Sequence, residues 1–191
     1  MTSPSAAADA DCMTRLQDGD DLALNELMDR WQKPLSTFLF RYTGNEIAAI
    51  DLAQETFVRV YENRRSYRGG QFSSWLFSIA ANLCKNHARW QSRHPTVSLD
   101  AMDGEGASLR ETISPDASPS ERAVSEELAA AVRDAVHALP HDLKTVTLLF
   151  EYQDQSHGEI ASTLGCTAKA VETRLYRARQ ILREKLARWV N

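Results

Sequence analysis

Side chains that can bind DNA bases gather between residues 172 and 180, near the C-terminal end of the sequence. Arginine and glutamine can each make two hydrogen bonds to a base edge, threonine can contact a base or a phosphate, and tyrosine adds an apolar face. The predicted base-reading residues are Glu172, Thr173, Arg174, Tyr176, Arg177 and Gln180. The opposite side of the same predicted helix carries an apolar stripe of Val171, Leu175, Ala178, Leu182 and Leu186.

The residues before this helix are typical of a helix-turn-helix. Ser156 and Glu159 have the spacing of a capping box at the start of a first helix. Gly165 can adopt the left-handed conformation of a tight turn, and Thr167 can cap the next helix, which we expect over about residues 167–189. Because these signals occur in order, we predict binding in the major groove. A solvated basic helix face is the alternative interpretation.

A second polar stripe follows the helix expected over residues 46–61. Gln54 and Glu55 follow Asp51 by three and four residues, and Arg59 shares this stripe. Carboxylates repel phosphate, so the stripe suits a basic protein partner better than DNA. Composition alone favours the simpler interpretation of an ordinary solvated helix face.

The following helix is basic instead of acidic. Its polar face consists of Ser78, Asn82, Lys85, Asn86, Arg89 and Arg93, and the loop before it contains Arg64, Arg65 and Arg68. Basic side chains bind phosphates, while Tyr67 and Phe72 lie among them and can stack on unpaired bases. This combination predicts contact with single-stranded nucleic acid.

These two basic regions belong to an acidic chain. The 191 residues carry a net charge of -4 at pH 7. Residues 59–94 nevertheless contain seven basic side chains and one glutamate, and residues 172–191 contain six basic and two acidic side chains. The distribution predicts contact with phosphate backbones at two separate places.

The composition excludes several classes of protein. Hydrophobic residues make up 43% and charged residues 25%, which is ordinary for a globular chain. No apolar stretch approaches the ~20 residues of a transmembrane helix, and the first residues do not resemble a secretory signal. We therefore expect a cytoplasmic protein without membrane insertion. The three cysteines contain no close pair and do not indicate a disulfide framework.

Motifs for catalysis or metal binding are missing from the sequence. His137 and His141 have the spacing of zinc ligands, but Pro140 interrupts the helix that such a pair needs. Cys84 lies near His87, but it borders an apolar stripe and is expected to be a buried small hydrophobic residue. We find no phosphate-binding glycine loop and no nucleophile elbow. We therefore expect no metal, no cofactor and no catalytic activity.

Apolar periodicity is helical almost throughout and predicts an all-α fold. The pattern assigns Ile47, Ile50, Trp75 and Trp90 to faces that share one core, and Pro34 predicts a kink or a break. Proline, glycine and acidic residues are frequent between the two helical parts. The prediction is an N-terminal acidic tail over residues 1–21, a helical domain over 22–94, a flexible acidic linker over 95–117 and a second small helical domain over 118–191.

Several motifs occur in the order known from one family. They are Asp51-Leu-Ala-Gln-Glu-Thr-Phe57, Trp75-Leu-Phe-Ser-Ile-Ala-Ala-Asn82, Ala138-Leu-Pro140 and Glu159-Ile-Ala161. With them, about residues 22–93 and 121–188 resemble the bacterial extracytoplasmic-function (ECF) sigma factors of the sigma-70 family. The resemblance implies a transcription initiation subunit, with sigma region 2 over residues 22–94 and sigma region 4 over 118–191.

The resemblance also implies what region 2 binds. Asp51, Gln54 and Glu55 fall on the motif that binds the clamp helices of core RNA polymerase. Residues 64–73 fall on the loop that captures a flipped base of the -10 element. The helix that faces the same DNA carries Asn82, Lys85, Asn86 and Arg89.

For region 4, the resemblance implies recognition of the -35 element and contact with the polymerase flap. Thr173, Tyr176 and Arg177 fall on the positions that read DNA. Glu172 stands where the family often has a basic residue, and this difference affects the promoter sequence. An anti-sigma factor is a further expected partner.

A function from another class explains part of the same pattern. A free-standing helix-turn-helix regulator would bind an operator as a dimer and use residues 22–93 as a sensor. A sensor does not need a second basic region beside an acidic stripe, which favours the sigma factor. The test is whether the chain binds duplex promoter DNA alone or only with core polymerase.

Overall fold

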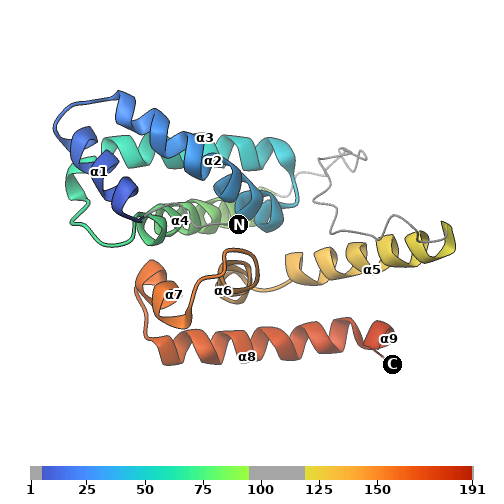
Figure 1. Cartoon of the computed structure of the whole chain (residues 1–191). Helices are drawn as coiled ribbons and strands as arrows, with labels where there is room; N and C mark the ends of the chain where they lie inside the picture. Colours follow the sequence, from blue (N-terminus) through green and yellow to red (C-terminus); the bar gives the residue numbers. More distant parts are fainter. Residues whose placement is uncertain (1–5, 95–118, 191) are drawn as a thin grey trace.

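The computed structural model of the chain describes residues 6–94 and 119–190. The first half contains α1 (Ala6–Gln17), α2 (Leu22–Thr43), α3 (Glu46–Glu62), the 3-10 helix η1 (Arg64–Ser66) and α4 (Phe72–Arg93) (Figure 1). The second half contains α5 (Pro119–His137), α6 (His141–Tyr152), α7 (His157–Leu164), α8 (Ala168–Lys185) and α9 (Ala187–Val190). The all-α prediction is confirmed, and the predicted linker over 95–117 lies outside the described residues.

Aromatic side chains of α2 and α4 form the centre of the first half. The ring of Trp31 lies edge-on to Phe72 and Phe77, with centroids 6.1 and 6.2 Å away. Phe38 makes a third such contact with Phe77 at 5.3 Å. Edge-to-face pairs add stability beyond the apolar area that they bury. They fix one side of α4 in the core, so that its opposite side faces outward.

Residues 6–17 form a packed helix where the sequence predicted part of an acidic tail. Cys12, Met13 and Leu16 of α1 are buried in the same core as α2. Asp9 is also buried, where its Oδ2 accepts a hydrogen bond of 3.1 Å from Nε1 of Trp31. Burial of this apolar face offsets the entropy lost on ordering the helix. The acidic composition of the segment concealed that face.

Three apolar residues assigned to the core are exposed instead. Ile47, Ile50 and Trp90 have relative exposures of 71%, 48% and 54%. Helix α3 buries a narrower face, which includes the small residues Ala49 and Ala53, and therefore leaves its two isoleucines outside. Trp75 is half-buried and packs against the core.

Two local predictions about helix geometry have different outcomes. Helix α2 continues through Pro34 without dividing into two shorter helices. The helix-turn-helix has the predicted caps: Ser156 and Glu159 form a capping box, and Oγ1 of Thr167 accepts a hydrogen bond from the N–H of Ala170. Between them Gly165 has a φ of 61°, in the left-handed region that favours glycine.

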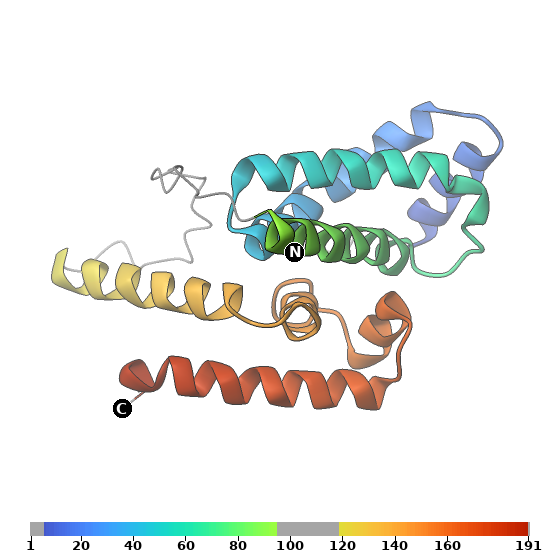
Figure 2. The same cartoon turned by 180° about the vertical axis from the view of Figure 1, so that it is seen from behind.

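The two halves pack together as two layers (Figures 1 and 2). Helix α7 packs against α4, α6 packs against both α2 and α4, and α5 packs against α2. Buried residues of both halves, such as Leu76 and Leu149, belong to one hydrophobic cluster. No local sequence pattern indicates this packing.

The packed α1 predicts a stability effect that a tail would not show. Leu16→Ala should lower the free energy of unfolding by about 2–5 kcal/mol, because it removes a fully buried side chain and leaves a cavity. Thr14→Ala, on the exposed side of α1, is the matched control and should change it by less than about 0.5 kcal/mol. Chemical denaturation measures both; equal stabilities would contradict the packing of α1.

Candidate nucleic-acid interface

The acidic stripe, which we define as Asp51, Gln54 and Glu55, lies on the outer side of α3. Asp51 and Gln54 are exposed, and Glu55 accepts a hydrogen bond of 2.7 Å from Nε of Arg59. The stripe is bordered by exposed apolar side chains: Ile47, Ile50 and Val58. Acidic and apolar side chains together suit contact with a protein better than contact with DNA.

The segment between α3 and α4 separates the three arginines that the sequence placed together. The guanidinium of Arg64 folds back on α3, where it donates a hydrogen bond of 2.7 Å to the carbonyl of Tyr61 and lies 4.1 Å from the centre of that ring. Arg65 and Arg68 are exposed. We call residues 64–70 the arginine loop; two of its arginines are open to an anionic partner.

Tyr67 and Phe72 are unavailable for stacking on bases. Their relative exposures are 8% and 2%, and both rings pack in the core beside Trp75. The hydroxyl of Tyr67 also donates a hydrogen bond of 2.6 Å to the carbonyl of Gly70. The interpretation from sequence was wrong because these rings gain more from burial against α2 and α4 than from exposure.

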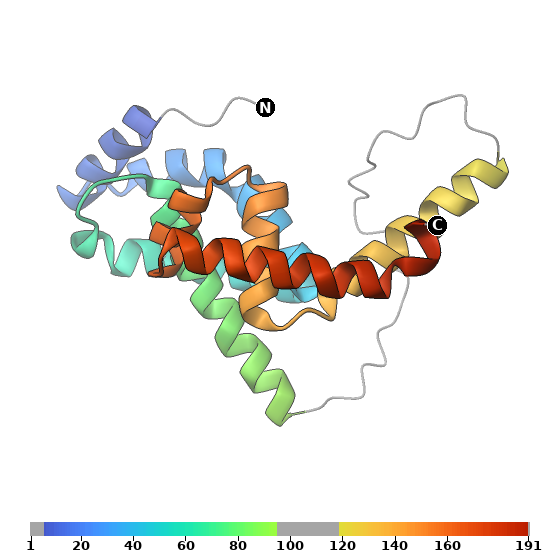
Figure 3. The same cartoon turned by 90° about the horizontal axis from the view of Figure 1, so that it is seen from below.

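The basic face of α4 consists of Asn82, Lys85, Asn86 and Arg89. Asn82, Asn86 and Arg89 are exposed, while Lys85 is half-buried. The C-terminal end of α4 projects beyond the helices of the second half (Figure 3). The structure thus places all four predicted residues on one helix and leaves three of them open.

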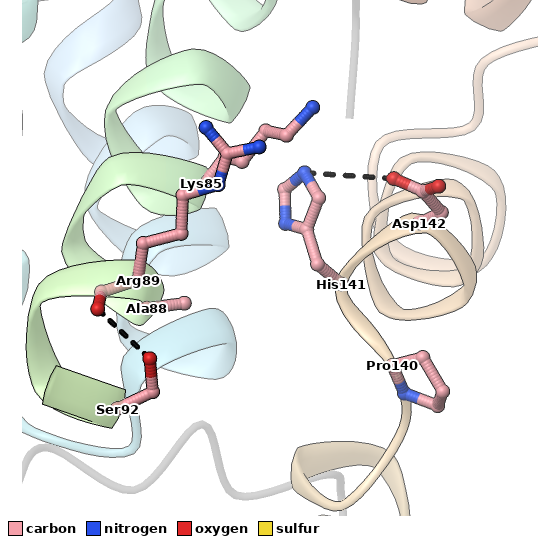
Figure 4. A pocket seen from close by; sticks show the side chains of 7 residues that line it. All are labelled: Lys85, Ala88, Arg89, Ser92, Pro140, His141 and Asp142. Atoms are coloured by element: carbon pink, nitrogen blue, oxygen red, sulfur yellow. Dashed lines mark hydrogen bonds and ion pairs between the residues drawn. The ribbon is translucent and has the colours of Figure 1, made fainter.

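A cleft beside this face separates α4 from the start of α6 (Figure 4). Its lining residues are Lys85, Ala88, Arg89, Ser92, Pro140, His141 and Asp142. Part of the basic face therefore lies next to the second half of the same chain.

Hydrogen bonds from the end of α2 hold the two halves together at this junction. The hydroxyl of Tyr42 and Nδ1 of His141 are 2.6 Å apart, and Nε2 of His137 donates to the carbonyl of Thr43 at 2.9 Å. The ammonium of Lys144 lies 4.8 Å from the centre of the Tyr42 ring. The two histidines, considered above as a zinc pair, therefore bind α2 through separate hydrogen bonds.

Burial at the junction lowers the pKa of two basic side chains, His141 and Lys144. It lowers the pKa of His141, and the positive charges of Lys85, Lys144 and Arg89 lower it further, while Asp142 acts in the opposite direction. Burial also lowers the pKa of Lys144. The packed state thus disfavours a protonated His141.

The recognition face of α8 consists of Glu172, Thr173, Arg174, Tyr176, Arg177 and Gln180. All are exposed except Arg174, which is half-buried and has its Nη1 3.7 Å from Sγ of Cys166. Gln180 donates a hydrogen bond of 2.9 Å to the hydroxyl of Tyr176, and Glu172 pairs with Lys169 at 2.8 Å. Five polar side chains thus share an exposed helix face directly after a tight turn.

Sequence analysis missed residues that support these surfaces. Lys144 and Gln17 connect elements far apart in the chain, and no local pattern marks them. Within the described residues, no helix is long and apolar enough to cross a membrane. The same part of the chain holds no group of three or more His, Cys, Asp or Glu side chains that could bind a metal.

Comparison with protein families assigns each half of the chain to a region of the sigma-70 factors. Residues 27–94 match the family model of sigma-70 region 2, and residues 129–182 match that of sigma-70 region 4. The ECF RNA polymerase sigma-E factor of Haemophilus influenzae is 35% identical over 90% of this chain and 92% of its own length. The sigma-E factor of Escherichia coli K12 is 33% identical over 90% of this chain and 91% of its own length. The chain belongs to the ECF sigma factors of the sigma-70 family.

Solved structures share the fold. CnrH, solved in complex with the cytosolic domain of CnrY, aligns with a TM-score of 0.69 at 24% identity and covers 94% of this chain and 97% of its own. RpoE of Bartonella quintana, in complex with the anti-sigma factor NepR, aligns with a TM-score of 0.61 at 21% identity. The alignment covers 85% of this chain and 96% of RpoE.

The junction predicts that the packing of the two halves weakens in acid. Above its ordinary pKa of 6.5, His141 is neutral whether the halves are packed or separated. Below it, the separated form takes up a proton that the packed form resists, so the packed form loses stability as the pH falls. Small-angle X-ray scattering should show a radius of gyration that increases between about pH 7.5 and about pH 5.5.

His141→Gln should reduce this pH dependence, and His94→Gln, which changes an exposed histidine of the first half, should leave it intact. Burial also lowers the pKa of His87, which accounts for a remaining dependence. Identical curves for the wild type and His141→Gln would contradict the role of His141.

Proposed function

We propose that this ECF sigma factor binds core RNA polymerase through α3, opens the -10 element with the arginine loop and α4, and reads the -35 element with α8. The observation that carries the proposal is the pair of exposed polar faces on α4 and α8, each backed by a buried core within one chain. The proposed action is binding and positioning, without catalysis, and its place is the cytoplasm, where polymerase works.

The acidic stripe is the proposed contact for the clamp helices. Its carboxylates are exposed at Asp51 and partly exposed at Glu55, and the apolar side chains beside it supply surface that a partner can bury. Charge of one sign at such a contact increases the association rate and excludes partners of the same sign.

The basic face and the arginine loop are the proposed -10 contacts. Arg65, Arg68 and Arg89 are exposed cations that can bind phosphates, and Asn82 and Asn86 can hydrogen-bond bases. Lys85 is half-buried and lines the cleft between α4 and the start of α6, beside the second half. We therefore propose that the packed form is the free form and that polymerase favours the separated one.

The recognition face is the proposed -35 contact, with base-reading roles for Thr173, Tyr176, Arg177 and Gln180. Two structural neighbours were solved as complexes, one of them with an anti-sigma factor. By analogy, we propose that this chain also has an anti-sigma partner and that region 4 contacts the polymerase flap. The free-standing regulator is not favoured, because the similarity to sigma factors spans both halves.

Reversal of the acidic stripe tests the polymerase contact. Asp51→Lys with Glu55→Lys should weaken binding to core polymerase by more than about tenfold and abolish run-off transcription, because like charges then face each other. Glu126→Lys with Glu127→Lys makes the same charge change on exposed residues of α5 and should bind normally. Equal affinity of the two double variants would show that the stripe is only solvated surface.

Salt dependence tests the basic face. Lys85→Ala with Arg89→Ala should reduce the slope of log affinity against log salt by about 0.7 for each lost contact with single-stranded DNA. Lys33→Ala, which removes an exposed cation from α2, is the control and should leave the slope of log affinity against log salt unchanged. If the double variant keeps the wild-type slope, this face does not bind DNA.

Base discrimination tests the recognition face. Arg177→Ala should lose roughly 1–3 kcal/mol of discrimination at one position of the -35 element. Arg177→Lys keeps the charge without the two-point geometry, so it should also lose discrimination while binding nearly normally. A panel of single-base promoter variants measures both; a uniform loss across the panel would exclude a base contact by Arg177.

A further inference from the structure

The end of α1 is joined to the arginine loop by a single side chain. Gln17 is the last residue of α1, and its side-chain Nε2 donates hydrogen bonds to two backbone carbonyls. The first, to Arg64, is 2.7 Å long, and the second, to Tyr67, is 3.0 Å long. The first carbonyl belongs to the first residue of the short η1 helix and the second to the residue that follows it, so one amide group holds both ends of this turn.

Helix α1 is itself firmly attached to the core. Asp9 accepts a hydrogen bond from Nε1 of Trp31, and Met13 and Leu16 are fully buried. The ring of Trp31 in turn contacts Phe72, the first residue of α4. Gln17 therefore holds the loop from a rigid support.

The rest of the arginine loop has little intrinsic rigidity. Gly69 and Gly70 both have positive φ values, 87° and 89°, and nothing lies within 4 Å of a Cβ atom built on either. The hydrogen bond from Tyr67 to Gly70 is the contact that spans these glycines. Tyr67 is therefore held at its backbone by Gln17 and holds Gly70 through its hydroxyl.

We propose that Gln17 is a positioning residue for DNA opening: its two hydrogen bonds hold the arginine loop in the conformation that receives the -10 strand. The inference rests on the proposed function of that loop. A preformed loop loses less conformational entropy on binding than a mobile one. Loss of the two Gln17 hydrogen bonds therefore weakens DNA binding without removing a DNA contact.

Three variants of Gln17 separate this role from others. Gln17→Leu removes both donors, and Gln17→Glu keeps the shape but places a carboxylate against two carbonyls. Gln17→Lys keeps donors without an acceptor, which is all that two carbonyls require. Asp18→Ala alters the exposed neighbour and is the matched control.

Hydrogen exchange of the free full-length protein gives a readout that does not depend on transcription. Backbone amides within residues 64–70 should exchange about tenfold faster in Gln17→Leu and Gln17→Glu, which corresponds to the loss of two ordinary hydrogen bonds. Gln17→Lys and Asp18→Ala should match the wild type. Unchanged exchange in Gln17→Leu would overturn the proposal.

Promoter opening with core polymerase gives the second readout. Gln17→Leu should open a duplex promoter about tenfold less well, with normal affinity for core polymerase and recovery in Gln17→Lys. An equal loss of core affinity, or normal opening, would overturn the positioning role. Failure of the wild-type protein to open any promoter would instead contradict the function proposed for the chain.

Discussion

The buried side of α4 fixes the orientation of this helix and, through it, of the surfaces around it. Phe72, Leu76, Phe77, Ala80 and Cys84 all have relative exposures of 2% or less and form one continuous side of the helix. A helix so fixed cannot rotate about its axis, because rotation would expose these side chains to water. The direction of the basic face, the end of the arginine loop and the contact surface for α6 and α7 all follow from this side.

The polar surfaces of the chain differ in charge, and each therefore suits a different partner. Acidic and apolar side chains lie together on α3, whereas the exposed cations of α4 and the recognition face of α8 belong to other helices. In an acidic chain this separation limits nonspecific attraction to DNA. It confines the contact with DNA to two surfaces, on α4 and on α8. The junction between Tyr42 and His141 adds a restraint, because it keeps Lys85 beside the second half.

Local signals explain what could be predicted from the sequence. The capping box at Ser156, the turn at Gly165 and the cap at Thr167 each act within four residues, and the helix-turn-helix was found in the predicted place. Periodicity shows which residues share a helix face, but it does not show whether another element covers that face. Ile47 and Trp90 were therefore assigned to a core that does not reach them.

Long-range contacts explain what the sequence did not show. Tyr42 and His141 are 99 residues apart, and Gln17 lies 47 and 50 residues from the carbonyls that it binds. Helix α1 carried a signal in Cys12, Met13 and Leu16, whose spacing suits one helix face, but net charge obscured it. Promoter opening by the chain can be followed by the fluorescence of 2-aminopurine placed in the -10 element of a duplex promoter. The fluorescence should increase only when the chain and core polymerase are both present. An unchanged signal with both present, together with tight binding of the duplex by the chain alone, would contradict the proposed function.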